Sequence, residues 1–265
     1  MTQAGARAAV TLGAEPGIGP AEGARLAADL NERFLSMLGG LTPQQWGAVT
    51  ACDPWTVKDI AAHLLGWAEA LSSVREMRSQ VARGFRRSKE YGNPYDAQNQ
   101  VQVEDRRDLT TDELIARLGA RLPAAVKTRR RVGTALHYVP WYTGYLAGLI
   151  NLGYLANAIF LRDLLTHRID IHDATRVDPL LGESDRRVFA DMLKDWARRT
   201  GAEVRLELGG PLGGSYIAGS GIAGTISGDG VDLLRVLAKR ADPGTVPVEG
   251  NRPRIRGWLA RGCPV

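Results

Sequence analysis

The stretch LANAIFLRDLLTH, from Leu155 to His167, carries the most informative pattern of this 265-residue chain. Leu155, Ile159, Asp163 and His167 recur at intervals of four residues, so on a helix they share one face. A carboxylate and an imidazole therefore interrupt a stripe that is otherwise apolar, and burying either group without a partner is costly. Side chains four residues apart on a helix can direct two ligands to one point. The stretch predicts a buried metal site or, without a metal, a buried Asp163–His167 hydrogen bond.

A third ligand is predicted on an earlier helix. Ile60, His63 and Trp67 are spaced by three and four residues, so the imidazole of His63 shares an inward face with two large apolar side chains. His63 together with Asp163 and His167 would give a set of two nitrogens and one oxygen with an open coordination position. The alternative is a core histidine with one satisfied hydrogen bond.

Asp170, His172 and His137 are further candidates for this site. The first two form the pattern H-x-x-D-x-H with His167. His172 lies five positions after His167, which on a helix rotates it away from the face of the first ligand, so we expect it at the surface. Asp170 is expected behind the ligands or as a helix cap. His137 falls in an expected loop and is a weaker candidate for a residue that lines the site.

Helical periodicity dominates the first two thirds of the chain. Four long helices are predicted, and they indicate a four-helix bundle; their ranges are 21–38, 57–83, 111–130 and 153–175. The polar segment 87–108, which contains Gly92-Asn93-Pro94, is expected to be a long loop. The glycine- and alanine-rich start, residues 1–20, is expected to be a flexible tail.

The pattern changes near residue 180. A helix is predicted over 184–200, strands over 203–208 and 225–227, a second helix over 231–240 and a last strand over 254–258. The fold class is therefore mainly α, with a small α+β domain after the bundle. The predicted domains are a tail at 1–20, a helical bundle at 21–180 and the α+β domain at 181–265.

Composition narrows the function. The net charge is +5 and the densest basic run is Lys127 to Arg131. No aromatic residues alternate with the basic ones, so we expect a solvated helix end or attraction for small anions rather than nucleic-acid binding. The apolar stretch 145–161 is interrupted by Asn151 and Asn157, so no membrane span is expected. The two cysteines, Cys52 and Cys263, fit a reducing cytoplasm.

Other catalytic motifs are weak. The segment GSGIAG, from Gly219 to Gly224, matches the dinucleotide-binding pattern G-x-G-x-x-G, which requires a strand before it and a helix after it. A strand is expected after it instead, so we predict no nicotinamide or flavin binding here. No cysteine nucleophile with an adjacent base is expected either.

Three segments carry a resemblance to a known family. They are C-x-x-W-T-V-x-D-I-x-x-H (Cys52 to His63), R-D-x-x-x-H-R-x-D-I (Arg162 to Ile171) and G-x-x-x-D-L-L-x-x-L-x-x-R (Gly228 to Arg240). In this order they resemble the mycothiol-dependent maleylpyruvate isomerase family of the DinB-like metal-binding four-helix bundles. The resemblance covers nearly the whole chain after residue 20. It implies a small α+β C-terminal domain of the sterol-carrier type.

The resemblance also implies site residues and cofactors. Its metal ligands fall on His63, Asp163 and His167, its metal is a divalent ion, usually zinc, and its cosubstrate is mycothiol or a related thiol. A basic substrate-binding catalytic residue falls on Arg240. The isomerase has a glutamate where this chain has Asp163, so the metal distance or metal choice is expected to differ.

The function expected from these features is a metal-dependent, thiol-using enzyme, an isomerase or a thiol S-transferase, that acts on an electrophilic and possibly anionic small molecule. A coordinating metal deprotonates the thiol, and positive groups such as Arg162 and Arg240 would stabilise developing negative charge. Two alternatives stay open: a binding or regulatory protein of the same fold without turnover, and a metal-independent enzyme that uses the same cavity.

Overall fold

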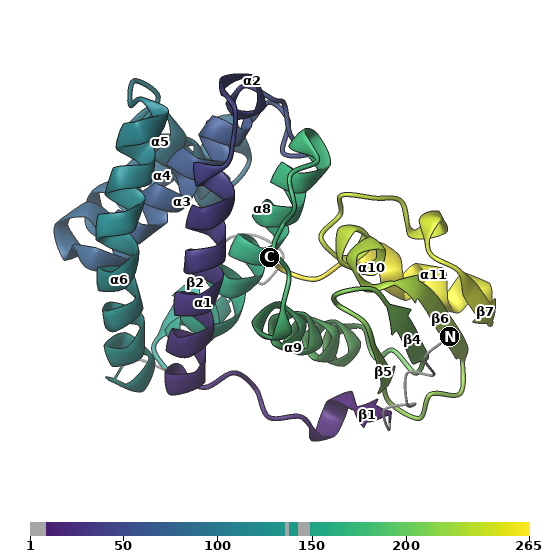
Figure 1. Ribbon diagram of the computed structural model, residues 1–265. Helices are drawn as coiled ribbons and strands as arrows, with labels where there is room; N and C mark the ends of the chain where they lie inside the picture. Colours follow the sequence, from purple (N-terminus) through teal and green to yellow (C-terminus); the bar gives the residue numbers. More distant parts are fainter. Residues whose placement is uncertain (1–8, 136–137, 143–148) are drawn as a thin grey trace. The chain divides into compact units, whose positions relative to one another are not determined.

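The computed structural model describes residues 9–135, 138–142 and 149–265 and consists of two compact units (Figure 1). The first unit is Ile18–Leu180. The second contains Leu181–Val265 together with the described residues up to Gly17. The chain passes from the first unit to the second after Leu180.

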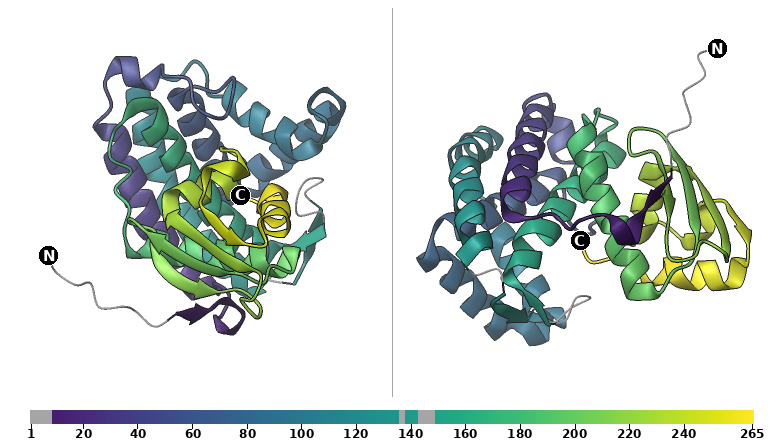
Figure 2. Two further views of the ribbon diagram at one scale, coloured as in Figure 1. Left: turned by 90° about the vertical axis from the view of Figure 1, so that its right-hand side faces the viewer. Right: turned by 90° about the horizontal axis from the view of Figure 1, so that it is seen from below.

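The first unit is a four-helix bundle with additional helices packed on one side. Its long helices are α1 (Pro20–Gly39), α3 (Val57–Ser72), α6 (Thr111–Ala135) and α8 (Phe160–Thr175). α1 and α3 each pack against both α6 and α8 (Figures 1 and 2). The predicted fold class, a helical bundle followed by a smaller α+β region, is confirmed.

Local signals explain where α3 begins and which face it buries. The hydroxyl of Thr56 accepts from the backbone N–H of Asp59, and the Asp59 carboxylate accepts from the backbone N–H of Thr56. This reciprocal capping satisfies two backbone donors that the first turn leaves free. Ile60 and Trp67 then pack inward on the face that also holds His63, and all three are buried.

Two expectations about the segment after α3 were wrong. The predicted helix 57–83 is interrupted at Ser73, which is extended and whose side chain caps a separate helix, α4 (Val74–Tyr91). The segment 87–108 is not a loop, because α4 continues to Tyr91 and α5 spans Pro94–Glu104. Asn93 and Pro94, which we took for a loop signal, begin α5: the Asn93 side chain accepts from the Asp96 N–H, and proline at the first helical position lacks an N–H to satisfy. A short helix, α2 (Pro43–Trp46), precedes α3.

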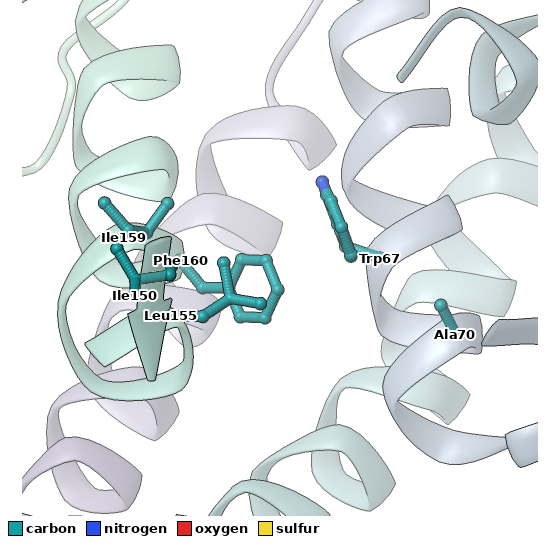
Figure 3. Close-up of a cluster of buried hydrophobic side chains, with 6 residues drawn as sticks. All are labelled: Trp67, Ala70, Ile150, Leu155, Ile159 and Phe160. Carbon is teal, nitrogen blue, oxygen red and sulfur yellow. The ribbon is translucent and has the colours of Figure 1, made fainter. Parts of the chain in front are cut away.

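The approach to α8 is less regular than the predicted helix 153–175. A two-stranded antiparallel sheet, β2 (Pro140–Tyr142) and β3 (Leu149–Asn151), leads into α7 (Leu152–Tyr154) and a π-helical turn, η2 (Leu155–Ile159). Leu155 and Ile159 are still buried, as their spacing predicted, and they belong to one apolar cluster with side chains of α3 and α8 (Figure 3). The π turn shifts the helical register just before Asp163 and His167, a feature often found at functional sites.

The second unit contains a mixed five-stranded sheet with the order β1-β5-β4-β6-β7. Its strands are β1 (Val10–Thr11), β4 (Arg205–Gly209), β5 (Gly214–Ile217), β6 (Gly224–Asp229) and β7 (Val248–Gly250), and its helices are α9 (Glu183–Thr200), α10 (Gly230–Leu237) and α11 (Arg252–Arg261). Short 3-10 turns are η1 (Leu12–Ala14) and η3 (Pro243–Thr245). α9 contacts α11 through the indole N–H of Trp196, which donates to the carbonyl of Trp258.

Two expectations about this unit were wrong. The segment 254–258 is part of helix α11, because Asn251 caps its first turn and Pro253 occupies an early helical position where no N–H is needed. Residues 10–14 are not a flexible tail: Val10 and Thr11 form an edge strand that pairs in parallel with Tyr216 and Ile217 of β5. The strands predicted at 203–208 and 225–227 correspond to β4 and β6.

The glycine-rich segment from Gly219 to Gly224 is a turn between β5 and β6. Gly219 and Gly221 have φ of +57° and +71°, which a residue with a Cβ rarely adopts. Gly224 is the first residue of β6. The segment is therefore followed by a strand rather than by the helix N-terminus that binds a pyrophosphate.

Among the described helices, none has both the length and the apolar character that a membrane crossing requires.

Candidate metal site

The bundle brings His63, Asp163 and His167 to one point. Nε2 of His63 lies 3.3 Å from Oδ2 of Asp163, and Nε2 of His167 lies 3.2 Å from Oδ1 of the same carboxylate. Metal bonds of about 2.0 Å in tetrahedral geometry place ligand atoms about 3.3 Å apart. Each imidazole lies at about this distance from one oxygen of the carboxylate, and one ligand atom from each of the three residues lies within 4.8 Å of the other two, so the group could hold a metal ion. The three side chains come from α3 and α8, which pack against each other.

A chain of three hydrogen bonds fixes which nitrogen of His63 carries its proton. The carbonyl of Gly66 can only accept, so the amide nitrogen of Gln80, 3.0 Å away, donates to it. The Gln80 oxygen then accepts from Nε2 of Gln102 at 2.8 Å. The Gln102 oxygen is left facing Nδ1 of His63 at 2.8 Å, so this nitrogen donates. In the neutral imidazole, Nε2 therefore presents a lone pair to Asp163.

The far side of His167 is held by Asp170, as we expected for a residue behind the ligands. Oδ2 of Asp170 lies 3.0 Å from Nδ1 of His167, and Asp170 is only 1% exposed. A histidine that donates one ring N–H to a carboxylate and directs the other nitrogen at the site is the usual arrangement of metal-bound histidines. Trp55 covers both rings, with its ring centroid 5.1 Å from that of His63 and 6.4 Å from that of His167.

The protonation states follow from burial and from Asp163. Burial is the largest influence on His63 and lowers its pKa below the ordinary value, so the imidazole is neutral. Burial also lowers the pKa of His167, but the carboxylates of Asp163 and Asp170 outweigh it and raise that pKa well above the ordinary value. Burial raises the pKa of Asp163, but the charge and the hydrogen bond of His167 outweigh it and lower that pKa. Without a metal, two hydrogen-bond acceptors face each other with no donor or cation between them: the Nε2 lone pair of His63 and Oδ2 of Asp163.

Asp163 borders a pocket inside the bundle. Asp163 keeps 13% of its side chain exposed, whereas the side chains of His63 and His167 keep 2% and 5%. The other walls of this pocket come from α1, α3, α6 and α8. A small molecule in this pocket would reach the carboxylate face of the site, which agrees with an open coordination position.

The other predicted site residues have different places. His172 is half-buried and its Nδ1 lies 2.8 Å from the Val177 carbonyl. His137 lies outside the described residues. Arg162 is 1% exposed and donates to the hydroxyl of Tyr154. Arg240 belongs to the second unit, just after α10, where its backbone N–H donates to the Arg235 carbonyl; its catalytic role stays a prediction.

One cysteine lies closer to the histidines than the sequence indicated. Sγ of Cys52 is 3.2 Å from Oδ2 of Asp170 and 3.8 Å from Nδ1 of His167. The expectation that no cysteine has an adjacent base was therefore wrong. Cys52, His167 and Asp170 also form a second group of donors close enough to hold a metal. Only the loop before α3 places Cys52 there, and helical spacing gives no signal for it.

The part of the chain that contains these residues matches a known protein family. The model of the mycothiol maleylpyruvate isomerase N-terminal domain matches residues 27–172, more than half of the chain. The chain belongs to this family. The matched range contains His63, Asp163 and His167. None of the curated proteins matches the chain.

Two solved structures have a similar fold over most of this chain. They are crystal structures of the mycothiol-dependent maleylpyruvate isomerase and of a histidine-to-alanine mutant of it. Their TM-scores are 0.55 and 0.53, at 18% and 17% identity, and each comparison covers 91% of this chain and 95% of the other. At this identity the likeness establishes the fold alone.

Metal binding at this site should depend on pH. Because the raised pKa of His167 keeps its Nε2 protonated in the metal-free protein at neutral pH, a metal must displace that proton. Below this pKa we expect zinc affinity to fall about tenfold for each unit that the pH falls. Calorimetric titrations in buffers of different ionisation enthalpy should report release of about one proton for each zinc at neutral pH. Affinity that does not change with pH would contradict a role for His167 as a ligand.

Proposed function

We propose that the chain is a metal-dependent enzyme that uses a low-molecular-weight thiol, mycothiol or a related compound, to attack an electrophilic small molecule. The observation that carries the proposal is the uncompensated pair of acceptors: Nε2 of His63 faces Asp163 at 3.3 Å while its Nδ1 donates to Gln102. A cation between the two removes this conflict. Two imidazoles and one carboxylate with an accessible side suit zinc in a catalytic role.

A bound metal ion would lower the pKa of a thiol that reaches it and so supply a nucleophile at neutral pH. The residues of the chain supply the rest. His63, Asp163 and His167 would hold the ion, while Gln102 and Asp170 keep the two imidazoles in the tautomer that directs Nε2 inward. The apolar walls of the pocket exclude water from the electrophile.

The proposal covers two outcomes of the same addition. When the thiol adds to one carbon of a cis-configured double bond, the former double bond can rotate, and elimination of the thiol then returns a trans isomer. When no elimination follows, the thiol stays on the product, and the enzyme is an S-transferase. Isomerisation and transfer need the same metal and thiol, so one experiment tests both.

The position of Asp163 on the pocket favours an enzyme over a non-catalytic metal protein. A structural zinc site is closed and four-coordinate, whereas the residues that the structure describes supply three donors to this site, one of which borders the pocket. A metal-independent enzyme that uses the same cavity is the remaining alternative, and activity that is lost without the metal would exclude it.

Activity should require the metal and the thiol together. Zinc-loaded protein, tested with mycothiol and a cis-unsaturated diacid, is expected to isomerise the acid or form an adduct, and omission of either component should abolish this. Cobalt in place of zinc should give a thiolate charge-transfer band when thiol is added, because sulfur then becomes a ligand. His167→Ala, which removes one ligand, should lose both signals. Turnover that persists without thiol, with no band, would exclude the proposal.

Cys52 should not be the nucleophile. Its Sγ lies on the Nδ1 side of His167, beside the Asp170 carboxylate, whereas Asp163 and the pocket lie on the Nε2 side. Cys52→Ser is therefore expected to leave thiol-dependent turnover close to that of the unmodified protein. Turnover rates at saturating thiol for both proteins provide the measurement. A complete loss in the variant, with zinc still bound, would assign the chemistry to Cys52.

A further inference from the structure

The pocket that Asp163 borders also contains polar groups that are not among the predicted metal ligands or their hydrogen-bond partners. The walls of the pocket are mostly apolar and come from α1, α3, α6 and α8. Among the residues that line it are Arg129 of α6, Trp67 of α3 and Phe160 of α8. Arg129 and Trp67 bring hydrogen-bond donors into these apolar surroundings.

Arg129 is a buried cation. It is 7% exposed, and its Nη1 is buried without a hydrogen-bond partner among the described residues. Its guanidinium lies over the ring of Phe160, 5.8 Å from the centroid. Burial lowers its pKa to about 10, which still leaves it charged at neutral pH. The basic run from Lys127 to Arg131 was expected to be a solvated helix end or to attract small anions, and for the buried Arg129 the first of these expectations was wrong.

Trp67 supplies a second unused donor. Its indole Nε1 is buried and has no hydrogen-bond partner among the described residues. The Trp67 ring packs against Phe160, with centroids 4.6 Å apart and ring planes tilted by 50°, and Figure 3 shows the two side chains approaching each other from different helices. Buried polar groups are nearly always hydrogen-bonded, and an unpaired buried charge is costly. Two donors in one pocket, both lacking an acceptor, indicate that a ligand brings the acceptor.

We infer that Arg129 and Trp67 bind a carboxylate group of the ligand in this pocket. A carboxylate offers two acceptor oxygens and a negative charge, which matches a guanidinium and a neutral N–H. The space that water can reach in the pocket is about 40 Å³. Because about 10–15 Å³ of such space holds one water molecule, the pocket accepts a group of few atoms. Asp163 borders the same pocket, so a molecule held by its carboxylate would extend toward the metal ligands.

The assignment of this carboxylate to the substrate rests on the proposed function, but binding of the anion does not. The test therefore uses metal-free protein with chelator present, acetate and malonate as probes, and acetamide and malonamide as neutral controls. The indole N–H resonance of Trp67, identified by its absence in Trp67→Phe, is followed by NMR as each probe is added. Zinc affinity is measured separately on the same proteins.

We expect the acids, but not the amides, to shift the Trp67 N–H resonance in a saturable way. Arg129→Gln should weaken binding about tenfold or more, because it removes a hydrogen bond to a charged group. Trp67→Phe should weaken it about two- to tenfold, because it removes a neutral donor and keeps an aromatic ring. Arg131→Gln removes the same charge from an exposed site on the same helix and should have no effect.

Several outcomes would overturn the inference: no shift with either acid, equal shifts with acids and amides, or equal binding by Arg129→Gln and the unmodified protein. If Arg129→Gln fails to fold, Trp67→Phe decides by the affinity for malonate, measured by calorimetry. Anion binding in a protein that binds no zinc would leave this inference standing and remove the proposed function. Zinc binding without anion binding would overturn this inference and leave the proposed function standing.

Discussion

Replacement of Asp163 by alanine is expected to abolish metal binding. The carboxylate lies between the two Nε2 atoms, 3.3 and 3.2 Å from them, and is the only negative group of the predicted ligand set. Loss of a residue that merely holds a ligand costs about 10–100-fold in metal affinity, so loss of this ligand should cost more than about a hundredfold. Competition titration with a chromophoric zinc chelator measures the difference.

The same substitution should also destabilise the metal-free protein. Breaking a buried ion pair by removing one partner costs about 3–5 kcal/mol in the free energy of unfolding, and here the imidazolium of His167 would lose its main partner. Denaturant unfolding with chelator present measures this change. Asp173→Ala, on the same helix but outside the predicted ligand set, serves as the control. Zinc affinity that is unchanged in Asp163→Ala would place the metal elsewhere or nowhere.

Gln102→Leu should weaken zinc binding about 10–100-fold although Gln102 touches no metal. Its oxygen, aligned by Gln80 and the Gly66 carbonyl, keeps the proton of His63 on Nδ1. Leucine has a similar volume but no acceptor, so His63 would be free to move the proton to Nε2 and donate it to Asp163. That tautomer cannot bind the metal through Nε2.

Nitrogen NMR of the His63 ring distinguishes this effect from simple loss of packing. In the metal-free protein the proton should reside on Nδ1, and in Gln102→Leu it should shift to Nε2. Gln98→Leu is the matched control, because Gln98 is a buried glutamine one turn earlier on the same helix. A tautomer that does not change in Gln102→Leu, together with unchanged zinc affinity, would show that the hydrogen-bond chain has no role in the site.

The convergence of three side chains was predictable from the sequence because helical spacing determines which residues share a face. Asp163 and His167, four residues apart, share a face of α8, and His63 shares the face of α3 that holds Ile60 and Trp67. Two helices that both bury these faces in one bundle bring the side chains together. The metal itself stays a prediction, as does the role of Arg240 in the second unit.

The supporting residues were not predictable, for reasons that differ from one to the next. Gln102 lies in α5, a helix that we took for a loop, since Asn93 and Pro94 begin helices as readily as they form turns. Cys52 reaches His167 through a loop whose path no periodicity describes. Arg129 is hidden in a basic run, where composition shows charge but does not show which side chain turns inward.

A crystal of the zinc-loaded protein, measured on both sides of the zinc absorption edge, would locate the metal. We expect one anomalous peak about 2 Å from Nε2 of His63, Nε2 of His167 and the Asp163 carboxylate. A peak on the other side of the His167 ring, between Cys52 and Asp170, or no peak within the bundle, would contradict this expectation.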